Sequence, residues 1–114
     1  MERWNQLFSS KAYRDKLEEL LIEKVKNEEM LLKASEEGDF EEVKRLIVSQ
    51  KVNVNTVGEC KSTPLINSAK KGHLEVVQFL VEFGANVNKA DKYGFTPLNN
   101  AAQKDHTDIV IFLL

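Results

Sequence analysis

The stretch TPLINSAKKGHLEVVQFLVEFGANVN, residues 63–88, decides the fold, because its motifs return later in the chain. The opening Thr63-Pro64-Leu65 recurs as Thr96-Pro97-Leu98. Four more pairs share this spacing, namely Ala69 and Ala102, His73 and His106, Val77 and Val110, and Leu80 and Leu113. A single period over several positions indicates tandem structural units, so the sequence predicts a repeat protein.

Each unit carries the signals of two short helices. Thr63 is a predicted N-cap, and Pro64 takes the first helical position, where its missing N–H costs nothing. Gly72 is suited to end this helix in left-handed backbone. The second helix has an apolar stripe that stops before Gly84 and consists of Leu74, Val77, Leu80 and Val81. In the loop that follows, Gly94 permits the positive φ of a projecting, hairpin-like finger.

A weaker third copy precedes these two. Its Asn-Val-Asn motif at 53–55 precedes the counterpart at 86–88 by one full period. Gly38, in contrast, precedes Gly72 by one position more than this period. The first copy therefore contains one extra residue, near 49–52.

The residues upstream of the repeats predict an amphipathic helix over 11–26, with Ser10 as its N-cap. Asn27 is predicted to begin a separate helix, the first of the first repeat. The apolar face of the upstream helix comprises Tyr13, Leu17, Leu20, Leu21 and Val25. Because the end of a repeat stack is uncovered unless something shields it, we expect this helix to cap the stack. A coiled coil and a partner-binding or membrane-surface helix are the alternatives.

These motifs resemble those of the ankyrin-repeat family, whose pattern contains Thr-Pro-Leu-His, Gly-His and Gly-Ala-Asp-Val-Asn. Residues 63–88 and 91–114 match the pattern closely, and residues 29–55 match it loosely. The resemblance implies an all-α ankyrin-repeat solenoid of stacked helix-turn-helix units with short β-hairpin fingers, capped by the N-terminal helix. The expected organisation is a helical cap at 1–26, a divergent repeat 1 at 27–60, repeat 2 at 61–93 and a truncated repeat 3 at 94–114.

The resemblance further implies a concave groove that binds another protein, formed by the fingers and the exposed side of each first helix. Carried over by repeat register, its predicted residues are Val57, Glu59, Cys60, Ser62, Lys70, Lys71, Lys92, Tyr93, Phe95, Gln103 and Lys104. Tyr93 and Phe95 are large aromatic side chains of the kind that dominate interfaces, although Phe95 packing under the next finger is an alternative.

Charge along the predicted groove changes from one end to the other. Lys70, Lys71 and Lys104 form a basic rim, whereas Glu36 and Glu37 make the repeat 1 end acidic. The hypothesis that follows is a partner segment with the opposite order of charges.

The candidates for catalysis or metal binding are few. His73 and His106 occupy equivalent places in successive repeats, so we expect them about 8 to 10 Å apart, too far for one zinc ion. The resemblance implies that each bonds the backbone of the neighbouring loop. Cys60 lacks the nearby histidine that a nucleophile needs. We therefore predict a non-enzymatic protein with no cofactor and no metal.

Composition argues against several kinds of partner. Sixteen basic and eighteen acidic residues give a net charge of −2, without the basic field that binds nucleic acid. The longest purely apolar run, residues 109–114, is far shorter than the roughly 20 residues that cross a bilayer, so no membrane insertion is expected. The N-terminus lacks signal-peptide features, and the single Cys60 cannot form an internal disulfide. The predicted location is the cytosol or nucleus.

The apolar end at Ile109–Leu114 leads to two further expectations. One is self-association through this end, because repeat arrays need a polar terminal unit for solubility. The other is an alternative function, in which the chain is the regulatory or targeting N-terminal part of a larger enzyme, channel or secreted effector whose active region lies beyond Leu114.

Overall fold

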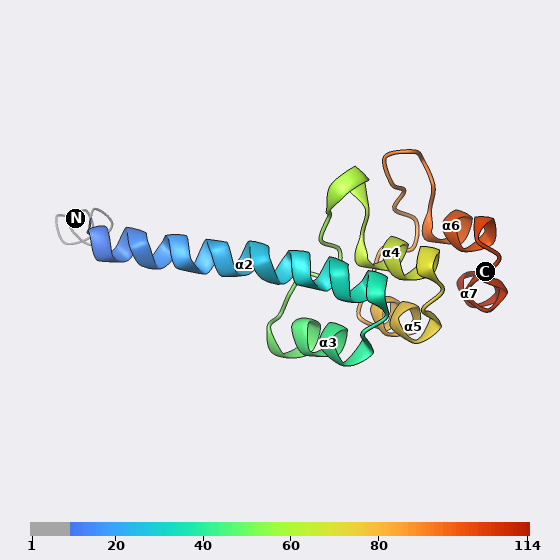
Figure 1. Cartoon of the computed structure of the whole chain (residues 1–114), viewed down its shortest axis with the longest axis horizontal. Helices are drawn as coiled ribbons and strands as arrows, with labels where there is room; N and C mark the ends of the chain where they lie inside the picture. The colour runs from blue at the N-terminus through green and yellow to red at the C-terminus, as the bar shows by residue number, and fades with distance from the viewer. Residues whose placement is uncertain (1–9) are drawn as a thin grey trace.

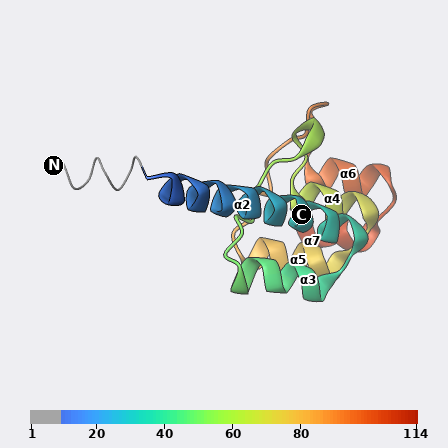
Figure 2. The same ribbon diagram turned by 60° about the vertical axis from the view of Figure 1, so that its left-hand side comes forward.

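The computed structural model describes residues 10–114 and consists of helix pairs stacked side by side (Figure 1). The helices are α2 (Lys11–Glu37), α3 (Phe40–Lys44), α4 (Pro64–Lys71), α5 (Leu74–Glu82), α6 (Pro97–Gln103) and α7 (Thr107–Leu113). Helices α2, α4 and α6 form one row and α3, α5 and α7 form a second row (Figure 2). Fully buried apolar residues from both rows fill the space between them, among them Leu31, Leu65, Val77, Leu80 and Ile109.

The predicted helix signals are confirmed at both ends of the repeat helices. Thr63 Oγ1 accepts a hydrogen bond of 3.2 Å from the Ile66 N–H, and Pro64 is the first residue of α4. Gly72, with φ 84°, ends α4 in left-handed backbone. Asp105 takes the corresponding place after α6 with φ 59°, a conformation that Asp adopts more readily than most residues.

The extra residue of repeat 1 is absorbed in a π-helix. Helix α3 continues directly into a π-helical turn, η1 (Arg45–Ser49), in which the Gln50 N–H donates to the Arg45 carbonyl at 3.2 Å. A π-turn holds one more residue than an α-turn, and Lys51 follows with φ 56°. The chain then returns to the repeat register at the Asn-Val-Asn motif.

The predicted break at Asn27 is wrong, because α2 is one continuous helix of 27 residues. Ser10 caps it as expected, accepting a hydrogen bond of 3.3 Å from the Tyr13 N–H. Strong helix formers surround Asn27, and no Gly or Pro interrupts the run, so intrahelical hydrogen bonds outweigh the capping preference of one asparagine. The first repeat therefore begins inside a helix.

The expected cap over the stack is not confirmed for the residues that the structure describes; residues 1–9 of the predicted 1–26 cap lie outside them. The N-terminal half of α2, residues 11–24, projects beyond the repeats as an arm (Figure 1). Its apolar side chains are 41 to 67% exposed, namely Leu17, Leu20, Leu21 and Ile22. Within residues 10–114, no helix is both long and apolar enough to span a bilayer.

The loops between the helix pairs project as fingers, but the described residues contain no β-strand, so the predicted β-hairpins are corrected to turns. The first finger, residues 53–62, carries a 3₁₀-helical turn, η2 (Glu59–Lys61), with Cys60 at φ 57°. The second finger, residues 86–95, is closed by two backbone bonds, from the Asp91 N–H to the Phe95 carbonyl at 2.9 Å and from the Gly94 N–H to the Asp91 carbonyl at 3.0 Å. Neither finger has a run of paired backbone groups, which a strand ladder requires.

Candidate functional site

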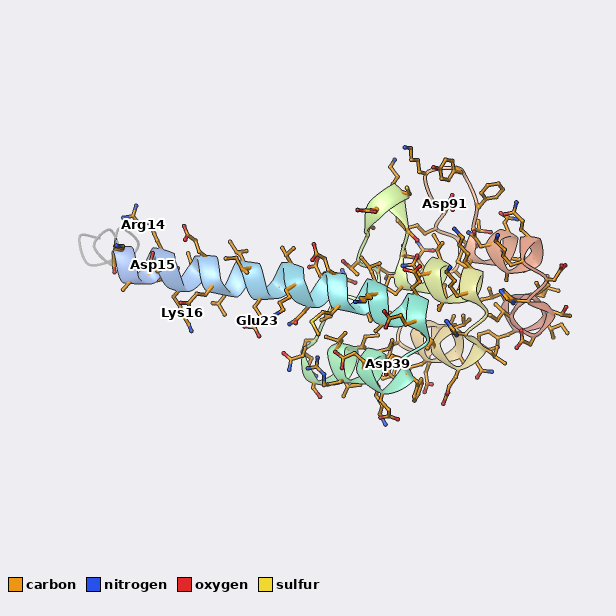
Figure 3. All side chains as sticks on the ribbon, in the orientation of Figure 1. Arg14, Asp15, Lys16, Glu23, Asp39 and Asp91 are labelled. Carbon is orange, nitrogen blue, oxygen red and sulfur yellow. The ribbon has the colours of Figure 1, made fainter. Side chains whose placement is uncertain are left out.

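A groove of about 770 Å³ lies between α2, α4 and the two fingers. One side of α2 lines it from Val25 to Glu36, and Ile66, Asn67 and Lys70 line it from α4. Asp91 in the second finger also lines it, and Figure 3 shows Asp91 on the side of the molecule opposite Asp39.

Six of the eleven predicted site residues line this groove: Val57, Glu59, Cys60, Ser62, Lys70 and Tyr93. The other five lie outside the lining: Lys71, Lys92, Phe95, Gln103 and Lys104. Lys71 instead lies 3.9 Å from the Glu36 carboxylate, and the Lys92 ammonium lies 5.9 Å from the centroid of the Tyr93 ring. Phe95 is 39% exposed, and Gln103 and Lys104 are exposed at the end of α6.

The sequence analysis missed the lining that comes from α2. This lining includes Val25, Glu28, Glu29, Leu32 and Lys33. The spacing between Gly38 and Gly72 contains a signal for this lining. The same spacing makes Leu32 equivalent to Ile66, which lines the groove from the neighbouring repeat. The predicted cap at 1–26 concealed this relation, since it treats the start of the helix as separate from the first repeat.

Hydrogen bonds hold the walls of the groove in place. The Asn67 side-chain amide donates to the Leu32 carbonyl at 3.3 Å and so ties α4 to α2. The Thr56 hydroxyl donates to the Glu28 carboxylate at 3.2 Å and ties the first finger to α2. The Lys92 N–H donates to the Cys60 carbonyl at 2.7 Å, which joins the two fingers. The groove is therefore preorganised on three sides.

The two histidines connect neighbouring repeats, as the resemblance implies. His73 Nε2 lies 2.8 Å from the Glu36 carbonyl, and His106 Nε2 lies 3.0 Å from the Lys70 carbonyl, so each ring donates to the preceding repeat. A Cβ on Gly38 would lie 2.5 Å from the His73 ring, and one on Gly72 would lie 2.7 Å from the His106 ring. The histidines thus serve the stacking of the repeats.

The groove lining does not bring together a nucleophile and a histidine. Its lining includes the thiol of Cys60, the hydroxyl of Ser62 and the phenol of Tyr93, and neither histidine belongs to the lining. The Ser62 hydroxyl instead bonds the Asn67 side chain. Among residues 10–114, no three His, Cys, Asp or Glu side chains are grouped so as to hold a metal ion.

The charges of the groove are mostly negative. Its lining carries five carboxylates, from Glu28, Glu29, Glu36, Glu59 and Asp91, and two ammonium groups, from Lys33 and Lys70. Outside the groove, hydrogen bonds of 2.7 and 2.9 Å from Arg45 hold the pKa of Glu42 below its ordinary value.

Comparison with known proteins agrees with the helix pairs. A family model of ankyrin repeats in three copies matches residues 31–114, from within α2 to the end of α7. No curated protein was found to match the chain. Because the match covers well over half of the residues, the chain belongs to the ankyrin-repeat family.

Proposed function

We propose that this chain is a protein-recognition module that presents its groove to a protein partner and carries out no catalysis. Ankyrin repeats are generally protein–protein interaction modules, which supports the general class. The observation that carries the proposal is the groove itself, whose walls are hydrogen-bonded to one another while apolar side chains remain exposed in it.

Two exposed side chains supply contact area for a partner. Tyr93 is 66% exposed and Val57 is 48% exposed, and both line the groove. Large, rigid side chains of this kind bury much area on binding at a modest entropic cost. Because the fingers are already tied together, little conformational freedom is lost when a partner binds.

The test uses peptides selected from a random dodecapeptide display library against the intact chain. Substituting Tyr93→Ala and Val57→Ala together is expected to weaken the selected peptides by about tenfold or more, because both anchors are lost. Phe83→Ala is the control, because Phe83 is 45% exposed but lies outside the groove, stacked on Phe79. Peptides that bind both variants as well as the original chain would show that the groove is not the binding surface.

Self-association through Ile109–Leu114 stays a separate prediction. Ile111 and Leu114 are 68 and 86% exposed, so apolar surface is available at this end of the stack. Sedimentation should detect an association that grows with concentration and is lost in Ile111→Asp; a protein that stays monomeric at high concentration would rule it out.

The alternative role within a larger protein is tested by sequencing the complete reading frame, and the location in the cytosol or nucleus by imaging the tagged protein.

A further inference from the structure

The groove has an apolar floor and apolar edges. Ile66 is almost fully buried at its base, and Leu32 of α2 is half-buried beside it. Val25, Val57 and Tyr93 stand around them with about half or more of their surface exposed. An apolar side chain of a partner that enters here would therefore contact apolar groups on several sides.

The carboxylates of the lining surround this apolar strip from both walls. Glu28 and Glu29 come from α2, Glu59 from the first finger and Asp91 from the second. With Glu36 and the two lysines, five carboxylates and two ammonium groups give the lining a net charge of −3. The whole chain has a net charge of only −2, so its negative charge is concentrated in the groove.

Within residues 10–114, ion pairs with lysines engage only one of the five lining carboxylates, that of Glu36. Lys33 lies 3.9 Å from Glu37, which is outside the lining. Lys71, also outside the lining, lies 3.9 Å from Glu36. Glu29 and Glu59 are exposed, and their side-chain carboxylates have no ion-pair or hydrogen-bond partner among residues 10–114. These two carboxylates are therefore free to pair with charges on a bound molecule.

Two other carboxylates are fixed in position. Glu28 accepts the hydrogen bond from the Thr56 hydroxyl. Asp91 Oδ1 accepts hydrogen bonds of 2.9 and 3.0 Å from the backbone N–H groups of Tyr93 and Phe95. Because these bonds hold the carboxylates in place, little side-chain freedom is lost when a cation approaches them.

We propose that the groove takes a segment of a partner protein in which lysine or arginine side chains flank at least one apolar side chain. This inference rests on the proposed function and names the chemistry of the partner. The apolar side chain packs between Leu32, Val57 and Tyr93, and the cations pair with the surrounding carboxylates. Complementary charge of this kind raises the association rate and rejects acidic segments.

The length of the segment follows from the groove. The lining of α2 extends from Val25 to Glu36, which are eleven residues apart, or roughly 16 Å along a helix. An extended chain covers that distance with about five residues.

The dodecapeptides selected against the intact chain provide the first test. We expect their sequences to be enriched in Lys and Arg around Leu, Ile, Phe or Tyr, and depleted in Asp and Glu. Their affinity should fall as salt rises from about 50 to about 300 mM, because exposed ion pairs are screened. Enrichment of acidic or uncharged peptides would overturn the inference.

The second test reverses two charges in the groove. The double substitution Glu29→Lys with Glu59→Lys should weaken the selected peptides by about tenfold or more, because both unpaired carboxylates become cations. The control is Glu18→Lys with Glu82→Lys, which changes the net charge equally at exposed positions outside the groove. Circular dichroism of both variants verifies the helical fold.

The outcomes separate this inference from the function on which it rests. Peptides that lose binding in Tyr93→Ala with Val57→Ala but tolerate the charge reversal would leave the groove function intact and refute the basic segment. Peptides that tolerate both pairs of substitutions would refute both. A dimer of the chain itself that dissociates on charge reversal would assign the groove to a second copy and overturn the proposal.

Discussion

The two halves of α2 place similar apolar residues in opposite environments. In the arm, Leu20 and Leu21 are 53 and 60% exposed, whereas Leu31 in the C-terminal half is fully buried. Both halves belong to one uninterrupted helix, so helix propensity does not distinguish them. The difference is the neighbour: α4 packs against the C-terminal half, and the arm extends past it (Figure 1). In a stacked repeat, an apolar stripe is buried only where the next unit lies beside it.

The largest expected effect tests this comparison directly. Leu31→Ala should destabilise the protein by about 2 to 5 kcal/mol, because it leaves a cavity in the core between the helix rows. Leu20→Ala, the matched change in the arm, should alter the free energy of unfolding by no more than about 0.5 kcal/mol. Urea unfolding measures both. Equal losses would mean that the arm is packed in solution.

The two ends of α2 provide the next test. At Gly38, φ is 76° and a Cβ would collide with the His73 ring at 2.5 Å, so Gly38→Ala should cost about 1 to 3 kcal/mol of global stability. At the arm end, Ser10→Ala removes the N-cap and should reduce helix content without lowering the global melting temperature. Both quantities come from circular dichroism.

The variant Gly84→Ala measures the cost of backbone strain alone, so it separates that cost from the cost of the steric collision in Gly38→Ala. Gly84 has φ 93°, but no atom beyond its chain neighbours lies within 4 Å of the place that a Cβ would occupy, so this variant carries only the backbone cost. A loss as large as that of Gly38→Ala would contradict the proposed contact with His73.

A smaller effect of opposite sign is expected from Ser35, in the buried half of α2. Its hydroxyl is fully buried and has no hydrogen-bond partner within residues 10–114, so Ser35→Ala should stabilise the protein by about 1 kcal/mol. Ser68 is the control: it is equally buried, but its hydroxyl donates to the Leu65 carbonyl at 3.1 Å. Ser68→Ala should bring no comparable gain in a thermal melt.

The smallest expected effect concerns pH and compares two ion pairs of equal spacing. Hydrogen bonding from Arg45 lowers the pKa of Glu42 in the folded protein, so this pair stabilises the fold above the ordinary pKa of the carboxyl. The contribution is lost as the pH falls through the lowered pKa. Glu42→Gln should therefore slightly reduce the urea midpoint at about pH 7, and this reduction should shrink as the pH falls below the ordinary pKa of the carboxyl.

Glu19→Gln is the matched change in the arm. Its carboxylate lies 3.8 Å from the Lys16 ammonium, and both side chains are about 70% exposed. We therefore expect Glu19→Gln to leave the urea midpoint unchanged at either pH. A pH-dependent loss in this variant as large as that of Glu42→Gln would remove the distinction between the arm and the repeats.

Much of the repeat fold could be predicted because its signals are local. Thr63 and Pro64 begin a helix through their own backbone chemistry, and Gly72 ends it in the same way. The period of the sequence places His73 and His106 at equivalent positions, and the resemblance to ankyrin repeats implies their backbone contacts.

The arm and half of the groove could not be predicted from local signals. An apolar stripe such as Leu17 to Val25 shows that a helix has two faces, but it does not show which element, if any, covers one of them. A cap that ends at residue 26 separates the arm from the first repeat, and the contribution of Glu28 and Glu29 to the groove then goes unnoticed. Loops lie at the positions where the register predicts fingers, and their turns form no strands in the described residues.

The π-helical turn at Arg45–Ser49 has a consequence for how this architecture accommodates changes in chain length. The turn lies at the end of the outer helix of repeat 1, and no residue from 38 to 56 belongs to the groove lining. An inserted residue there widens one helical turn and leaves the distance between α2 and α4 untouched. The length of the row formed by α3, α5 and α7 can thus vary by an inserted residue, while the groove side chains of α2 and α4 vary independently of it.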